Sequence, residues 1–242
     1  GFFIRQSRAA NPLVPLRILR NANVRGANLI QALMISGLFG VFFLGALYME
    51  RVLGWGPLEI GLGFLPVAVL IGLMSIRFAE PLIMRFGARA TLIAGLSFLL
   101  AGVVWFARIP ADANYAVDML PTMILIGAGA GLSFPSMMTL AMSGAGQSDS
   151  GLASGLINTS IQVGGALSLA LLVTLSTTRT ENLLGAGESA AEALTGGYRV
   201  AWIVAAGLLT VALAAAITLL KPITAPQAAE DGELEAAYSE AA

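Results

Sequence analysis

The stretch ANLIQALMISGLFGVFFLGALYM, residues 27–49, runs for 23 residues without a charged side chain. A helix needs about 20 apolar residues to cross a hydrocarbon core of about 30 Å, so this stretch predicts a membrane-spanning helix. Further long apolar stretches fill most of the remaining chain. They cover residues 58–78, 91–107, 119–142, 152–177 and 200–220. The sequence therefore predicts an all-α integral membrane protein with six transmembrane helices.

The composition supports the same fold class. Hydrophobic residues make up 57% of the chain and charged residues 11%, whereas soluble domains carry roughly 25% charged residues. The chain has no Cys and no His, which excludes disulfides, the usual zinc sites and thiol nucleophiles. It also lacks an HExxH motif and a pair of intramembrane Asp residues. We therefore expect no enzyme, no cofactor, no metal and no nucleic-acid partner.

Basic residues distinguish the two faces of the predicted bundle. Eight of them fall on the side that holds both termini and four on the opposite side, when Arg77 inside a span is left out. By the positive-inside rule this excess predicts a multi-pass protein of the cell membrane with both termini in the cytoplasm. The eight are Arg5, Arg8, Arg17, Arg20, Arg25, Arg85, Arg89 and Lys221, and the four are Arg51, Arg108, Arg179 and Arg199.

Three segments flank or interrupt the predicted bundle at residues 27–221. Residues 1–26 contain the amphipathic stretch NPLVPLRILRN, which suits either a helix on the inner membrane surface or a plain linker. The Gly-, Ala- and Glu-rich residues 178–197 predict an external loop. Residues 222–242 contain two prolines and clustered acids, which predict a disordered cytoplasmic tail.

Four motifs resemble those of one transporter family. They are LYMERVLGWGPLEIGLGFLP (residues 47–66), PLIMRFGARATL (81–92), GAGAGLSFPSM (127–137) and GLASGLINTSIQVGGALSLAL (151–171). Together they are similar to the C-terminal half of the major facilitator superfamily, and most closely to its fourteen-span drug:proton antiporters. The resemblance implies six helices in two pseudo-repeated triplets. It also implies that an N-terminal half precedes this chain, as the helix-like start GFFIRQSR suggests.

Two of these motifs suggest residues for gating or coupling. Arg85, Gly87 and Arg89 match the superfamily's inner-loop motif, but Met84 stands where that motif has Asp. The resemblance therefore implies a weakened charge relay. Glu50 occupies a position where the family commonly has Gln, and it is a candidate for an external gate or for proton entry.

Glycines and a proline in the later motifs suggest helix packing or helix motion. Pro135 lacks a backbone N–H and would leave a carbonyl free, permitting a kink. Glycines allow helices to approach closely, so packing is one explanation for them and bending between states is another. These glycines are Gly127, Gly129, Gly131, Gly151, Gly155, Gly164 and Gly165.

Two amides in the fifth apolar stretch are candidate cargo contacts. Asn158 and Gln162 lie four residues apart and share one helical face. Amides are costly in lipid, so they either bond a neighbouring helix or line a polar pathway. Gln31 in the first stretch presents the same two alternatives.

Aromatic and Met side chains suggest a soft surface for apolar cargo. Flexible Met side chains suit promiscuous pockets, although ordinary packing or lipid contact explains such residues as well. The resemblance implies that the first helix of each triplet lines the central cavity, which favours the first and fourth spans. The candidates there are Met34, Phe39, Phe42, Phe134 and Met138.

These patterns lead to one functional hypothesis and two alternatives. The hypothesis is the C-terminal domain of a proton-coupled antiporter that exports drugs or apolar metabolites by alternating access. Its partners would be the N-terminal transmembrane half, the lipid bilayer, small apolar or amphiphilic cargo, and protons. No Asp or Glu lies at the centre of a predicted span, so the coupling acid is expected in the other half. The alternatives are a half-size carrier that pairs with a second copy, and a membrane scaffold or remnant that does not transport.

Overall fold

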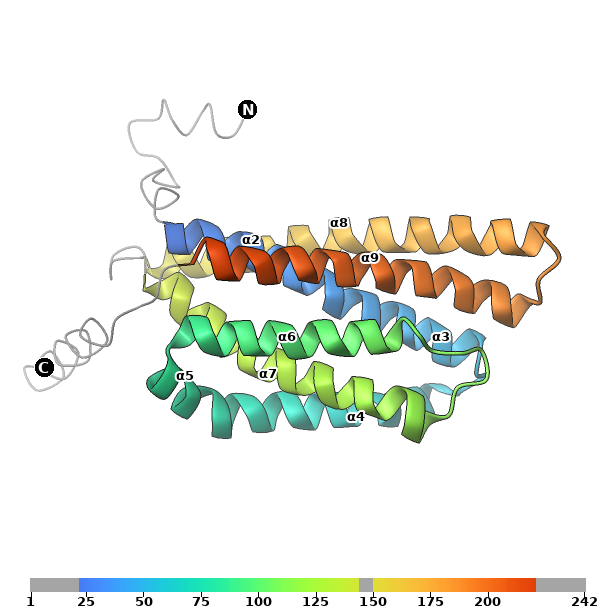
Figure 1. Cartoon of the computed structure of the whole chain (residues 1–242), viewed down its shortest axis with the longest axis horizontal. Helices are drawn as coiled ribbons and strands as arrows, with labels where there is room; N and C mark the ends of the chain where they lie inside the picture. Colours follow the sequence, from blue (N-terminus) through green and yellow to red (C-terminus); the bar gives the residue numbers. More distant parts are fainter. Residues whose placement is uncertain (1–21, 144–149, 221–242) are drawn as a thin grey trace, which may run out of the picture.

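The computed structural model describes residues 22–143 and 150–220, and this part of the chain consists of helices joined by short turns. Six helical runs are long and apolar enough to cross a membrane, as predicted. They are Val24–Arg51, Pro57–Phe86, Ala88–Phe106, Tyr115–Met142, Ser154–Gly185 and Ala190–Thr218. Three runs include a π-helical segment, marked η, and Figure 1 shows the resulting elongated bundle. The elements in order are α2 (Ala22–Phe39), η2 (Gly40–Leu44), α3 (Gly45–Arg51), α4 (Pro57–Leu73), η3 (Met74–Ala79), α5 (Glu80–Phe86), α6 (Ala88–Phe106), η4 (Tyr115–Met119), α7 (Leu120–Met142), α8 (Ser150–Gly185) and α9 (Ala190–Thr218).

The connection between the last two spans is much shorter than predicted. The external loop expected at residues 178–197 is mostly helical, because α8 continues to Gly185 and α9 begins at Ala190. The Oγ atom of Ser189 accepts a hydrogen bond from the backbone N–H of Glu192 and so caps the start of α9. Ala, Leu and Glu are strong helix formers, so their abundance here extends the helices. The prediction of a long loop was wrong.

Two other predicted segments have little overlap with the described residues. Residues 22–26, assigned to the N-terminal arm, form the first turn of α2 and its continuation. The rest of that arm and the predicted tail at 222–242 lie outside the described residues.

Proline and glycine set several of the helix boundaries. Pro57, Pro81 and Pro121 lie in the first turns of α4, α5 and α7, where a missing N–H costs nothing. Gly87 separates α5 from α6 with a φ of 84°, a backbone conformation that favours glycine. The short turn at the inner-loop motif therefore depends on Gly87.

Several contacts between the first three spans and the last three come in equivalent couples. α2 packs against α8, and α7 packs against α4. These two pairs are equivalent when the triplets are exchanged, because span one then corresponds to span four and span five to span two. α9 with α2 and α6 with α7 form a second equivalent couple. These two couples agree with the predicted pair of triplets, a plan shared by many secondary transporters.

Burial differs greatly among the six spans. In an 18-residue apolar window, 61% of residues are buried in the first and fourth spans, and 44% in the third and sixth. The corresponding share is only 22% for the span of α8 and 11% for that of α4. Figure 1 shows α8 along one edge of the bundle, behind α9, and α4 along the other edge, behind α7. The spans of α4 and α8 therefore have faces that the other described helices leave uncovered.

Candidate transport site

The parallel helices α2 and α8 pack in a regular register, which determines the face that α8 leaves open. Ser160 Oγ donates a 2.8 Å hydrogen bond to Asn28 Oδ1. One turn further, a Cβ added to Gly164 would lie 2.8 Å from Ala32 Cα. Each contact thus recurs four residues later on both helices. The contacting pairs are Asn28–Ser160, Ala32–Gly164, Ser36–Ser168 and Gly40–Leu172.

The face of α8 away from this register presents the two candidate amides. Asn158 and Gln162 are both exposed. Asn158 Nδ2 donates to the Ser154 carbonyl of its own helix at 3.2 Å. Within the described residues, the hydrogen bond of Asn158 therefore does not join α8 to another helix. The two amides therefore form an exposed polar surface on the continuous helix α8.

The candidate phenylalanines of the first span differ in accessibility. Phe42 lies in η2 with 37% of its surface exposed, and its ring centroid is 5.2 Å from that of Phe64 on α4. Phe39 is half-buried, and its ring lies 3.1 Å from the position that a Cβ on Gly165 would take. Phe42 is therefore available at the surface, whereas Phe39 packs the α2–α8 contact.

The fourth span contributes one exposed and one partly buried candidate. Met138 on α7 is 43% exposed, and Phe134 is half-buried. α7 packs on both α2 and α8. Four of the cargo candidates are thus accessible: Phe42, Met138, Asn158 and Gln162. The elements that carry them, η2, α7 and α8, pack against α2, and α8 also packs against the other two.

The remaining two cargo candidates lie inside the bundle. Gln31 is 1% exposed and Met34 is fully buried. Gln31 Nε2 has no hydrogen-bond partner among the described residues, and an unpartnered buried amide is destabilising by about 1–3 kcal/mol. In this conformation, both side chains belong to the core and offer no surface to cargo.

The Gly-rich stretch of α7 packs two different helices with alternate glycines. A Cβ on Gly127 would lie 2.9 Å from the Val67 carbonyl oxygen of α4. A Cβ on Gly129 would lie 2.7 Å from the Gly95 carbonyl oxygen of α6. Gly131 again faces α4, since its Cβ would lie 2.9 Å from the carbonyl oxygen of Ile71. The glycines therefore permit close backbone approach on two sides of one helix.

The glycines of α8 are used unequally. Gly164 and Gly165 contact α2, but no described atom lies within 4 Å of a Cβ built on Gly151 or Gly155. The expected packing role therefore applies to Gly164 and Gly165 in this structure. Gly155 instead belongs to the same exposed surface as Asn158 and Gln162.

Pro135 lies inside the uninterrupted helix α7. Because proline has no N–H, the carbonyl four residues earlier, that of Gly131, loses its helical donor. Ser75 Oγ in η3 donates to this carbonyl at 3.0 Å. The freed carbonyl predicted from the sequence is therefore present, and another span satisfies it.

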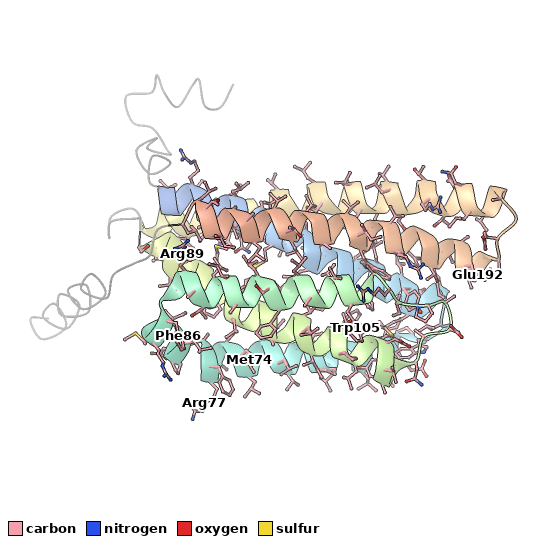
Figure 2. The ribbon with its side chains drawn as sticks, in the orientation of Figure 1. Met74, Arg77, Phe86, Arg89, Trp105 and Glu192 are labelled. Carbon is pink, nitrogen blue, oxygen red and sulfur yellow. The ribbon has the colours of Figure 1, made fainter. Side chains whose placement is uncertain are left out.

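The inner-loop motif has a structural role at its last residue. Arg89, near the start of α6, donates hydrogen bonds from Nε to the Ala216 carbonyl at 3.4 Å and from Nη2 to the Ile217 carbonyl. These carbonyls belong to the last turn of α9, where a positive charge is favourable. Figure 2 shows Arg89 beside this end of α9. Arg89 thus joins the third span to the sixth.

The other gating candidates have fewer contacts. Arg85 is exposed, and its guanidinium carbon lies 5.1 Å from the ring centroid of Phe86. Glu50 is exposed in α3, next to the end of the first span. Both are accessible charges at opposite ends of the bundle.

A buried Trp that sequence reasoning missed holds the π-helical segment of the first span. Trp202 on α9 is fully buried, and its Nε1 donates a 3.0 Å hydrogen bond to the Gly40 carbonyl. Its ring centroid lies 4.4 Å from that of Phe106 and 6.0 Å from that of Tyr48. A lone Trp in an apolar run indicates packing but not its partner, so only the structure connects it to Gly40.

The family model described as Major Facilitator Superfamily matches residues 3–169, more than half of the chain. The chain belongs to the major facilitator superfamily. It is therefore a multi-pass membrane protein of a transporter superfamily, and its six-helix fold agrees with a half of the superfamily architecture.

Its relatives in this superfamily include proteins named for resistance and export. The chain is 33% identical to the puromycin resistance protein pur8 of Streptomyces alboniger, over 86% of this chain and 43% of the relative. It is 34% identical to the cephamycin export protein CmcT of Amycolatopsis lactamdurans, over 73% of this chain and 36% of the relative. The tetracenomycin C resistance and export protein of Streptomyces glaucescens is 28% identical, over 74% and 33%. The chain thus spans less than half the length of these curated relatives.

Proposed function

We propose that this chain is the C-terminal half of an efflux transporter that exports drugs or apolar metabolites in exchange for protons. A second six-helix bundle would pack against it, and the two would rock to alternate access. Relatives named for drug resistance and export support the cargo class. Their greater length supports the partner bundle, because the chain aligns with only 43% of the first of them.

The observation that carries this proposal is the uncovered polar face of α8. Asn158 and Gln162 are exposed there, although α8 is a membrane span. Amide groups without partners are unfavourable in hydrocarbon. A face of this kind is stable against a partner bundle or a water-filled pathway, and both are found where two transporter halves meet.

Two further exposed side chains of the same bundle suit apolar cargo. Phe42 and Met138 expose large, adaptable side chains on elements that pack with α8 or α2. Apolar contact with a few polar groups is the usual composition of a small-molecule site. In the proposed transporter, these two residues contact cargo and the two amides orient it or interact with water.

Proton coupling is assigned to the partner half. The described acids lie near helix ends or in turns, as with Glu50 at the end of α3 and Glu80 at the start of α5. A coupling carboxylate needs desolvation to raise its affinity for a proton. We accordingly expect this bundle alone to bind cargo weakly and to perform no proton-driven transport. The basic-residue excess supports an orientation with both termini in the cytoplasm.

The experiment uses the whole transporter containing this half, in cells that accumulate a fluorescent drug. Replacing both Asn158 and Gln162 by Leu is expected to reduce efflux at least fivefold while leaving the amount of protein in the membrane unchanged. Asn182→Leu is a matched control, because Asn182 is an exposed amide further along α8. Normal efflux by the double variant would remove the α8 face from the mechanism.

A second copy of this chain would cover the same faces of α4 and α8. Cysteine crosslinking in native membranes distinguishes this alternative, since the chain has no Cys of its own. Gly155→Cys crosslinking to a second copy, rather than to a different bundle, would favour a dimerising carrier.

A further inference from the structure

Two pockets meet at one arginine beside the C-terminal end of α6. One has a volume of about 150 Å³ and the other about 320 Å³. Arg108 lines both. The smaller is lined by Trp105, Arg108, Ile109 and Asp118, and the larger by Val104, Ala107, Arg108, Ile203 and Ala206.

The smaller pocket brings opposite charges together. Arg108 is exposed and Asp118 is half-buried. Asp118 Oδ2 accepts a 2.8 Å hydrogen bond from the Asn114 backbone N–H, which fixes the direction of the carboxylate. On the other wall, the Ile109 carbonyl accepts a 3.1 Å bond from Arg199 Nη2. The pocket therefore contains an oriented carboxylate, and its lining carries one cation and one anion.

The larger pocket is apolar and lies between two spans. Val104 and Ala107 come from α6 and its C-terminal end, while Ile203 and Ala206 come from α9. Ile203 is 56% exposed, so this groove is open at the surface beside Ile203. An open apolar groove between membrane helices accommodates an acyl chain.

The position of the pockets matches the boundary between lipid and water. Trp105 is 47% exposed, and Trp is enriched at membrane interfaces. Figure 2 shows Trp105 toward the end of α6 opposite Arg89. Arg108 lies in the turn that directly follows the apolar helix α6. A phospholipid headgroup is found at this depth, with its chains extending along the helices.

We propose that this site binds one phospholipid with a phosphoethanolamine headgroup. Arg108 donates to the phosphate, as arginine does in many phosphate sites. The ammonium group donates hydrogen bonds to the carboxylate of Asp118, and one acyl chain lies in the groove between α6 and α9. Phosphatidylglycerol has no cation for Asp118. Phosphatidylcholine has a cation without N–H donors, so both fit less well.

The test is native mass spectrometry of the full chain, purified in detergent and titrated with each of the three lipids. We expect phosphatidylethanolamine to bind at least fivefold more tightly than the other two. Arg108→Gln should weaken the binding of all three lipids at least fivefold, because each of them carries the phosphate, whereas Arg85→Gln, which removes an exposed arginine on α5, should not change their binding. Asp118→Asn should equalise phosphatidylethanolamine and phosphatidylglycerol. Equal binding of all three lipids by the native chain, or unchanged lipid affinity in Arg108→Gln, would overturn the proposal.

A second pair of variants tests the groove without altering charge. Ile203→Trp should fill the groove and weaken phosphatidylethanolamine binding at least fivefold. Val211→Trp is the matched control, because Val211 lies on the same helix with 55% exposure. Equal lipid binding by these two variants would also count against the site. Thermal unfolding of each variant in detergent verifies that it is folded.

Discussion

Ser75 in η3 donates a hydrogen bond to the Gly131 carbonyl of α7, with 3.0 Å between the two oxygen atoms. Gly131 is four residues before Pro135, so its carbonyl has no donor within its own helix. The same glycine allows the backbone of α7 to approach η3, because a Cβ there would lie 2.6 Å from Met74 Cβ. Glycine, proline and serine on two spans thus form one structural unit.

The first prediction concerns Ser75→Ala. Loss of the Ser75 hydroxyl, which donates to the partly buried Gly131 carbonyl, should lower the free energy of unfolding by about 1–2 kcal/mol. Thermal unfolding in detergent measures it. Ser97→Ala is the control, since Ser97 Oγ donates only to the Ile93 carbonyl of its own helix. In a Pro135→Ala background, which restores the N–H, Ser75→Ala should cost much less; an equal cost in both backgrounds would disprove the link.

The second prediction concerns Trp202→Phe. The substitution removes the indole donor to the Gly40 carbonyl while keeping an aromatic ring in the core. We expect a loss of about 1–3 kcal/mol in the free energy of unfolding, because a buried carbonyl is left without its partner. Trp105→Phe should have little effect on stability, since Trp105 is half exposed. Equal melting temperatures for the two variants would contradict the role given to Trp202.

The third prediction compares two glycines of α8. Gly164→Ala forces a Cβ to within 2.8 Å of Ala32 Cα, so α2 and α8 must separate, at a cost of about 1–3 kcal/mol. Gly155→Ala meets no described atom within 4 Å and should stabilise the helix by up to about 1 kcal/mol. The free energy of unfolding, measured for the two purified variants in detergent, tests both expectations. A Gly164→Ala variant as stable as Gly155→Ala would show that the close contact is absent.

The fourth prediction concerns Arg89→Gln. Removing the guanidinium leaves the carbonyls of Ala216 and Ile217 without their charged donor. The last turn of α9 should then fray, and its amides should exchange hydrogen for deuterium about tenfold faster, which corresponds to roughly 1.4 kcal/mol. Arg85→Gln should leave that exchange unchanged. If the amides of the last turn of α9 exchange at the native rate in Arg89→Gln, Arg89 does not have this capping role.

The sequence predicted the spans well because membrane crossing depends on a local property. Any run of about 20 apolar residues meets that requirement wherever its neighbours lie. The predicted end of the fifth span at residue 177 was wrong for a related reason. Apolarity ends there, but helix propensity does not, and the chain remains helical to Gly185.

The candidate site was predicted less completely. Spacing alone placed Asn158 and Gln162 on one face of a helix, and the structure leaves that face open. Gln31 and Met34 satisfy similar residue-type criteria, yet both are buried. Periodicity identifies which residues share a face but does not identify what covers it.

The amino-acid sequence by itself determined the membrane class and the number of spans. Those properties follow from the length and apolarity of each segment, which do not depend on its neighbours. Only the tertiary structure decided that Gly127 faces α4 while Gly129 faces α6, that Trp202 bonds to Gly40, and that Arg89 caps α9. These contacts join residues distant along the chain, so they arise only when the helices pack together.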